Sequence, residues 1–505
     1  MAQFKQENIT DIYWASNDGF KGGRDPMGIQ NSSIATYGRL LPGLTNLTGH
    51  IRYYSLYCWL LSEYDKLEQN GEFEIHQYNF IRRSELAIAL MMKGLDVRSV
   101  VGALFVSQKK CKLTEEGFYD IASGADFESK EKYWTFKSGA FGQYYLGSMI
   151  YYDLVKIEEG RFYLRNKGKE LSLAVRNSID SRVRDLFVKC IQEGIISEDD
   201  IKELMPLALN KIEIGTDEWR YLNQMLTMKD KDGSSLRRET VFLFLKDIEK
   251  GVSVNEFPKY RFNNVLEEQN ISASFGWYFY YLCEVLHYCI ETIFCLILNE
   301  IFELHNPSIS FLSKQLQQQI LEHLQEEQLY DSISEWGNEL SAHISDKYDE
   351  LKKLVNDRMY AKAAANAIGL LLVLQNEYYK ESKVIKQFEI ENELIGQRCV
   401  FSSGIDTYVT RHISLSIPKY IETIILQVMQ EHTYIAIRKM GNSNMDLRKF
   451  IFEDGRVILV ERRTPTETTP RVNSLYNFLQ DLGYIDLHNQ LTDIAHNYIQ
   501  NYGKE

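Results

Sequence analysis

Proline is scarce in this chain of 505 residues. Only 8 prolines are present, with none between Pro42 and Pro206 and none between Pro307 and Pro418. Inside a helix, proline removes a backbone hydrogen bond and clashes with the preceding turn. Two long proline-free stretches therefore predict a mainly helical protein. Hydrophobic residues make up 44% and charged residues 25% of the chain, which is typical of globular domains.

Paired cysteines and familiar catalytic motifs are missing as well. The 7 cysteines are odd in number and include no Cys-x-x-Cys pair, which favours a reducing compartment with thiols as small core residues. No Gly-x-Ser-x-Gly, His-Glu-x-x-His or Gly-Lys-Ser/Thr motif occurs. We therefore predict no cofactor, no metal site and no catalytic residues.

No clean membrane-spanning or secretory segment is evident. The N-terminal residues are polar, unlike a signal peptide. The most apolar stretch, 275–302, is interrupted by Glu284, His287, Glu291, Asn299 and Glu300. The first three lie about one turn apart on one helical face. A two-metal carboxylate site would need a second Glu-x-x-His helix, and the chain has none. We predict a polar stripe on a buried helix, in a cytoplasmic protein without membrane contact.

One pattern occurs twice, in residues 143–174 and again in 474–495. Each copy is typical of an amphipathic helix, a tight turn, a short β-ribbon and a return helix. This order resembles a winged helix, which contacts DNA or another protein. The predicted fold class is mainly α, a multi-domain helical protein with two small winged-helix-like α+β units.

The same reading divides the chain into four segments. We expect an aromatic-rich helical N-terminal domain at 1–125, a winged-helix-like unit at 126–180, a helical middle domain at 181–390 and a C-terminal winged-helix-like domain at 391–505. Within the first segment, Thr48 is the predicted N-cap of a helix spanning 51–67.

The charge distribution limits nucleic-acid binding to local patches. The net charge is −13, yet 160–189 carries eight basic against three acidic residues, and 438–471 carries eight against five. Both islands overlap the winged-helix-like segments. The candidate DNA-binding residues are Arg462, Arg463, Arg471, Asn473, Asn477, Arg165, Lys167 and Lys169. Plain solubilising charge is the alternative explanation.

Two further groups are candidates for chemistry or binding. Asp454 and Glu461 flank a strand at 456–460 and partly match a metal-dependent nuclease, although Arg462 and Arg463 follow where a lysine is expected. A hairpin edge flanked by charges is the favoured explanation. An N-terminal partner or ligand site is suggested by polar groups among aromatic residues, namely Arg24, Asp25, Arg52, Tyr53 and Tyr54. A buried ion pair of Arg52 with Glu85 is the structural alternative.

Several short segments carry a resemblance to known proteins. These are Arg24–Gly28, Leu41–Thr45, Ile51–Ser55, Gly139–Tyr145 and Ile435–Lys439. They resemble a broad group of bacterial proteins encoded beside ATPases or nucleases in anti-phage defence loci. The resemblance implies an accessory subunit that bridges nucleic acid or a phage signal to a partner enzyme, and it implies no catalytic residues.

The sequence therefore favours a non-enzymatic scaffold or sensor subunit of a bacterial multi-protein complex. Its expected partners are other protein subunits, such as an ATPase or a nuclease, and DNA. Two alternatives remain open, a DNA-binding module that uses the winged-helix-like units and a divergent metal-dependent nuclease.

Overall fold

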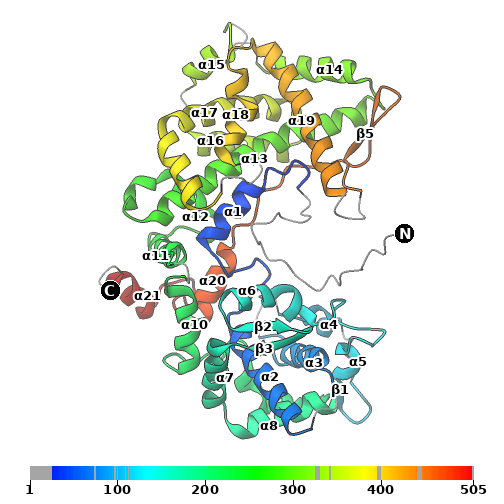
Figure 1. Ribbon diagram of the computed structural model, residues 1–505, viewed down its shortest axis with the longest axis vertical. Coiled ribbons are helices and arrows are strands. Elements are labelled where there is room, and N and C mark those ends of the chain that lie inside the picture. The colour runs from blue at the N-terminus through cyan, green and yellow to red at the C-terminus, as the bar shows by residue number, and fades with distance from the viewer. Residues whose placement is uncertain are drawn as a thin grey trace. The chain divides into compact units, whose positions relative to one another are not determined.

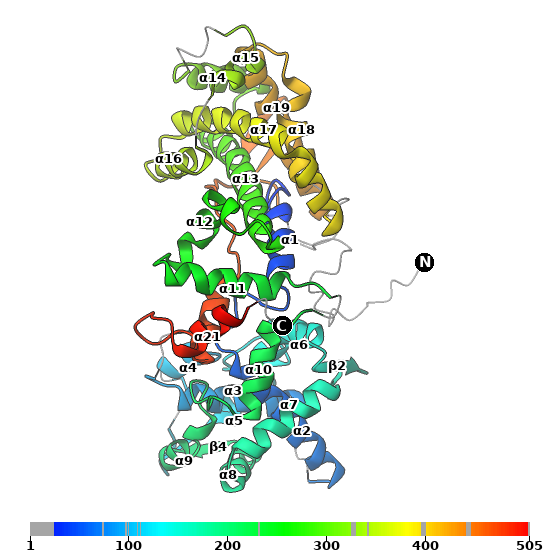
Figure 2. The same cartoon turned by 90° about the vertical axis from the view of Figure 1, so that its left-hand side faces the viewer.

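The computed structural model describes residues 25–502 except 73–74, 96–97, 99, 109, 112, 231–232, 325–329, 341–342, 395–399 and 441–445. The protein is mainly helical, as predicted, with a few short strands (Figures 1 and 2). The chain divides into two compact units. Unit 1 comprises Leu41–Asn255 and the chain from Pro470 onward, and unit 2 comprises 25–40 and Glu256–Thr469.

The division into two units differs from the four predicted segments. The predicted C-terminal domain, 391–505, is divided between the two units: its last two helices belong to unit 1 and the rest belongs to unit 2. The described chain passes between the units after Leu40, after Asn255 and after Thr469.

Unit 1 is built from helices and two small ribbons. Its longer helices are α2 (Arg52–Gln69), α3 (Gln77–Met91), α7 (Asn166–Ser178), α8 (Ser181–Glu193), α10 (Asp217–Thr227), α11 (Leu236–Glu249), α20 (Val472–Asp481) and α21 (Asp493–Asn501). Its shorter helices are α4 (Ala103–Ser107), α5 (Ile121–Ala125), the π-helix η1 (Phe141–Tyr145), α6 (Leu146–Tyr151), α9 (Glu198–Glu203) and the 3₁₀ helix η2 (Met205–Leu207). The aromatic helix α2 is buried along most of its length, and α7 packs along it (Figure 1).

The ribbons of unit 1 are antiparallel. Strand β1 (Phe118–Asp120) pairs with β4 (Ile195–Ser197), and β2 (Val155–Glu158) pairs with β3 (Arg161–Leu164) in a hairpin. The hairpin lies between α6 and α7, so the first copy of the repeated pattern has the expected order of helix, ribbon and helix. In the second copy a single bridge, Ile485 with Leu491, takes the place of the ribbon between α20 and α21.

The N-terminus of α2 is capped by a side chain that is distant in the sequence. Thr48 was predicted as the N-cap, but no side chain of that segment bonds the helix terminus. Instead, Oδ2 of Asp481, at the end of α20, accepts the Ile51 N–H at 3.0 Å. The Asp481 carboxylate also lies 2.7 Å from Arg98 and 3.2 Å from His50. A carboxylate at a helix N-terminus satisfies an open donor and the helix dipole, so α20 is fixed to α2 by this contact.

Unit 2 is a helical bundle with one hairpin. Its elements are α1 (Asn31–Leu40), α12 (Phe257–Asn263), η4 (Val265–Glu268), α13 (Ser272–Glu303), α14 (Ile309–Leu321), α15 (Ile333–Glu339), α16 (Ile344–Asn356), α17 (Tyr360–Glu391), α18 (Phe401–Tyr408), η6 (Thr410–His412), α19 (Ile417–Met440), β5 (Phe450–Glu453) and β6 (Arg456–Leu459). The short helix η3 (Val254–Glu256) straddles the boundary between the units.

The core of unit 2 forms around α13. This helix is buried along nearly its whole length, and within the described chain it alone is long and apolar enough to cross a membrane. Its most apolar window is completely buried inside the unit, as expected for a core helix. Helices α17, α1 and α12 pack against it (Figure 2). Gly276 permits the contact with α1, since a Cβ there would lie 2.5 Å from Cδ2 of Leu40.

The β5–β6 hairpin closes with a two-residue turn. Asp454 and Gly455 have φ values of 48° and 73°, the left-handed conformation that such hairpin turns require. The register pairs Phe450 with Leu459 and Glu453 with Arg456. After β6 the chain runs without regular secondary structure from Glu461 to Pro470. This segment positions the site described next.

Candidate functional site

Unit 2 contains an open cavity of about 1210 Å³. Its walls come from segments far apart in the sequence: the turn before α1, the end of α13, the junction of α16 with α17, and the chain on both sides of the β5–β6 hairpin. The lining residues are Asp25, Pro26, Gln30, Asn299, Glu303, Arg358, Tyr360, Asp446, Leu447, Lys449, Glu461, Arg462, Arg463, Thr464 and Thr466. The fold thus brings together Asp25, Arg462 and Arg463, which the sequence analysis assigned to two different sites.

Asp25 shapes the cavity wall through its backbone neighbours. Its Oδ1 accepts the N–H groups of Met27 at 3.1 Å and Gly28 at 2.7 Å, and its Oδ2 accepts that of Gln30 at 3.1 Å. These bonds fold the turn that leads into α1. Burial raises the pKa of the Asp25 carboxyl, and the charge of Lys439 opposes that shift. The side chain is therefore committed to the turn and offers little negative charge to the cavity.

His432 joins this turn to the hairpin. Its Nδ1 lies 2.9 Å from the carbonyl oxygen of Pro26, and its Nε2 accepts the Lys449 N–H at 2.9 Å. Both bonds are satisfied by a neutral imidazole that carries its proton on Nδ1. Burial lowers the pKa of His432 to about 4, which keeps the ring neutral at physiological pH.

The basic side chains of the cavity are held differently from one another. The Arg462 guanidinium stacks over the Phe302 ring, with its carbon 4.2 Å from the ring centroid. Arg463 lies 3.5 Å from Oγ1 of Thr466. Lys449 is paired with Glu461, so these two charges compensate each other.

Helix α13 carries a buried ionic triad formed by Glu284, His287 and Glu291, and Glu291 bonds the lining residues Gln30 and Thr466. The His287 Nδ1 lies 3.6 Å from Glu284 and its Nε2 lies 3.5 Å from Glu291, which are ion-pair contacts longer than a normal hydrogen bond. Burial alone lowers the pKa of His287, but the two carboxylates outweigh it and raise the pKa to about 10. The predicted polar stripe is therefore a charged triad.

The triad holds the segment that follows the hairpin. Glu284 accepts the backbone N–H of Thr468 at 2.5 Å and its hydroxyl at 2.6 Å. Glu291 accepts the N–H of Thr466 at 3.2 Å and the side-chain amide of Gln30 at 3.0 Å. No cluster of metal-ligating side chains is found in the described ranges of the chain. The segment 464–469 is called the strap below. The triad holds the strap in place through the bonds to Thr466 and Thr468.

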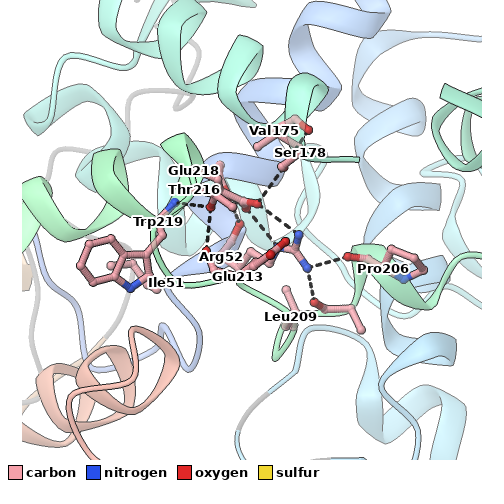
Figure 3. A network of polar contacts seen from close by, with 12 residues as sticks. Ile51, Arg52, Val175, Ser178, Pro206, Leu209, Glu213, Thr216, Glu218 and Trp219 are labelled. Carbon is pink, nitrogen blue, oxygen red and sulfur yellow. Dashed lines mark hydrogen bonds and ion pairs between the residues drawn. The ribbon is translucent and has the colours of Figure 1, made fainter. Parts of the chain in front are cut away.

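The predicted pair of Arg52 with Glu85 is wrong. Arg52 instead pairs with Glu218 of α10, at 3.0 Å and 3.1 Å, and donates to the carbonyl oxygens of Pro206 at 2.8 Å and Ala208 at 2.6 Å (Figure 3). Glu218 also accepts from Ser55 at 2.6 Å. Both charged side chains are almost fully buried. The network ties α2 to α10 inside unit 1.

Glu85 occupies a separate buried site. Its carboxylate accepts the hydroxyls of Tyr57, at 2.7 Å, and Tyr133, together with the N–H groups of Ala140 at 3.1 Å and Phe141 at 2.7 Å. Burial raises the pKa of Glu85 despite these donors. The carboxylate therefore fixes the start of the π-helix η1.

The residues of the predicted N-terminal site are divided between the two units. Arg24 lies outside the described residues, and Asp25 belongs to a different unit from Arg52, Tyr53 and Tyr54. The last three are at most 1% exposed, so no partner can reach them in the folded protein. Tyr53 and Tyr54 belong to an aromatic cluster around Tyr145.

The predicted DNA-binding residues fall into three groups. Arg462 and Arg463 line the cavity of unit 2, and Arg165, Lys167 and Lys169 are exposed at the first turn of α7 in unit 1. Arg471 donates to the carbonyl oxygen of Leu41 at 2.9 Å, and this bond stabilises the fold of unit 1. On α20, Asn473 is exposed, and the backbone oxygen of Asn477 accepts from Arg98 at 3.1 Å.

The nuclease-like pair does not converge. Asp454 lies in the hairpin turn, whereas Glu461 lies beyond the other end of β6, next to Lys449. A four-residue strand separates the two carboxylates by roughly 13 Å at about 3.3 Å per residue. One metal ion cannot bind both.

Several lining residues were missed by the sequence analysis, including Arg358, Tyr360, Asn299 and Glu303. Each lies at or near the end of a helix, and no local sequence pattern indicates that such positions share a cavity with Arg462. Comparison with protein-family models, curated proteins and solved structures finds no match to this chain.

Proposed function

We propose that this protein is a non-enzymatic sensor or scaffold subunit of a bacterial multi-protein complex, with anti-phage defence as its expected context. The observation that carries the proposal is the open, polar cavity of unit 2, whose walls present exposed guanidinium groups. The buried acids and bases nearby are held by internal bonds. Asp25, Glu284 and Glu291 each accept from the protein's own donors. Such a site supports binding better than proton transfer.

We further infer that the two copies of the repeated pattern, 143–174 and 474–495, are winged-helix-like modules that bind protein in preference to DNA. Three basic side chains around the first hairpin already have acidic partners: Lys156 pairs with Glu158, Arg161 with Glu68, and Arg165 with Asp153. Phosphate contacts would have to replace these pairs, which lowers the gain from DNA binding. Exposed apolar groups, Ile150 and Ile157, flank the same hairpin.

Affinity purification of the tagged protein from its native host, with and without nuclease treatment, tests the proposal. We expect protein partners that remain bound after nuclease treatment. A protein that purifies alone under both conditions would contradict the scaffold and sensor proposal. Loss of every partner on nuclease treatment would favour the DNA-binding alternative. In the DNA-binding alternative, the double variant Lys167→Gln with Lys169→Gln should bind nucleic acid more weakly and with a shallower salt dependence.

A further inference from the structure

We propose that the cavity of unit 2 binds a phosphate-bearing nucleotide. This inference rests on the proposed sensor function and names the chemical class of its signal. It follows from the charged side chains that face the cavity, from the backbone conformation of Arg358, and from the aromatic and amide groups of the cavity wall.

Most of the charges that line the cavity are compensated, and Glu303 is the one carboxylate there for which the described chain shows no partner. Lys449 and Glu461 neutralise each other, Asp446 is paired with Arg448 at 2.7 Å, and the Asp25 carboxylate is used by three backbone amides. Two exposed guanidinium groups remain, Arg358 and Arg462, and neither forms an ion pair within the described part of the chain. Guanidinium forks match phosphate oxygens in geometry and charge.

The backbone at Arg358 is an independent indication. This residue follows α16 with a φ of 60°, at the position where helices commonly end in glycine or asparagine. The left-handed conformation costs other residues roughly 1–2 kcal/mol. Bonds from Arg358 N–H to the Val355 oxygen, at 3.0 Å, and from Met359 N–H to the Leu354 oxygen, at 2.9 Å, hold the conformation. An arginine at a position that disfavours it fits a requirement for its guanidinium in the cavity wall.

The rest of the wall fits a base and a sugar better than a bare phosphate. Tyr360, two residues after Arg358, contributes a half-buried aromatic ring on which a base can stack. Gln30 donates its amide N–H to Glu291 and Asn299 donates its own to the Cys295 oxygen, so each can offer its amide oxygen, and Glu303 presents a carboxylate one turn after Asn299. These groups can pair with the donors and acceptors on the edge of a base. Phosphate alone would leave them without a ligand contact.

The cavity is large enough for this class of ligand. Its volume of about 1210 Å³ exceeds the roughly 300–1000 Å³ that small-molecule pockets usually enclose. A single nucleotide would therefore leave part of the cavity to solvent.

Isothermal titration calorimetry on the full-length protein, with EDTA present, tests the inference. The probes are ATP, GTP, CTP and UTP, with tripolyphosphate and adenosine as fragments that lack the base or the phosphates. We expect saturable binding of at least one triphosphate, and at least tenfold weaker binding of both fragments. Arg358→Asn and Arg462→Gln should each weaken binding by roughly tenfold or more, since each removes a charge-assisted hydrogen bond.

Arg411→Gln is the matched control. Arg411 lies in unit 2, pairs with Asp406 at 2.8 Å and does not line the cavity, so its loss should leave nucleotide affinity unchanged. Thermal melts of each variant confirm that it is folded. The inference is overturned if no triphosphate binds, if tripolyphosphate binds as tightly as the best nucleotide, or if the two cavity variants bind like the wild type. Co-purification of protein partners is measured separately, so the sensor proposal and the nucleotide proposal can fail independently.

Discussion

Removing one member of the buried Arg52–Glu218 pair should destabilise unit 1 severely. Glu218→Leu leaves the guanidinium buried without a counter-charge, and Arg52→Met leaves the carboxylate and two carbonyl oxygens without their donor (Figure 3). Breaking a buried ion pair in this way costs about 3–5 kcal/mol. In the double variant neither charge remains, so we expect it to lose less stability than the sum of the two single variants.

Hydrogen exchange of backbone amides measures this effect within unit 1. Amides of α2 and α10 should exchange roughly a hundred- to several-thousandfold faster in each single variant, since every 1.4 kcal/mol is about a factor of ten. Arg182→Gln is the control, because Arg182 is 81% exposed in its pair with Glu203 and should cost less than about 1 kcal/mol. Exchange that accelerates less than tenfold in Glu218→Leu, or a double variant equal to the sum of the singles, would refute the reasoning.

Three further predictions concern unit 2. The pKa of His287 is raised to about 10 from 6.5, so its ion pairs stabilise fully below pH 6.5 and lose that effect as the pH rises toward 10; thermal melts of His287→Gln should lack this decline. The pKa of His432 is lowered to about 4, so the neutral ring stabilises above pH 6.5 and the effect is lost as the pH falls toward 4; His432→Gln should lack that acid-side loss in the same assay. Arg358→Asn should raise the melting temperature of unit 2 by roughly 2–4 °C, because asparagine tolerates the left-handed conformation at lower cost, and an unchanged or lower value would contradict the strain argument.

Local patterns predicted the mainly helical class and the longest apolar helix. The apolar run at 275–302 is α13, and three of its polar interruptions, Glu284, His287 and Glu291, form the triad, because a spacing of three and four residues fixes a shared helical face. The strand predicted at 456–460 is β6. These features depend on neighbours along the chain, which the sequence displays directly.

Long-range pairing could not be predicted in the same way. Arg52 has Glu85 as a plausible carboxylate on the next helix, but it pairs with Glu218, which is 166 residues away. The Thr48 cap failed for the same reason, since Asp481 reaches the helix terminus from 430 residues away. A buried charge or an open helix terminus requires a polar partner, which the sequence alone indicates. Which residue is that partner depends on how α7, α10 and α20 pack against α2.

The cavity and the strap share one continuous segment of chain, which suits a sensor better than two separate sites would. Arg462, Thr464 and Thr466 line the cavity, and Thr466 and Thr468 are bonded to Glu291 and Glu284. Because residues 461–470 have no helix or strand hydrogen bonds of their own, the triad and the cavity wall determine where this segment lies. Beyond Thr469 the same chain enters unit 1 and begins α20, the helix that caps α2. A ligand held by Arg462 would therefore contact a segment of chain that continues into unit 1.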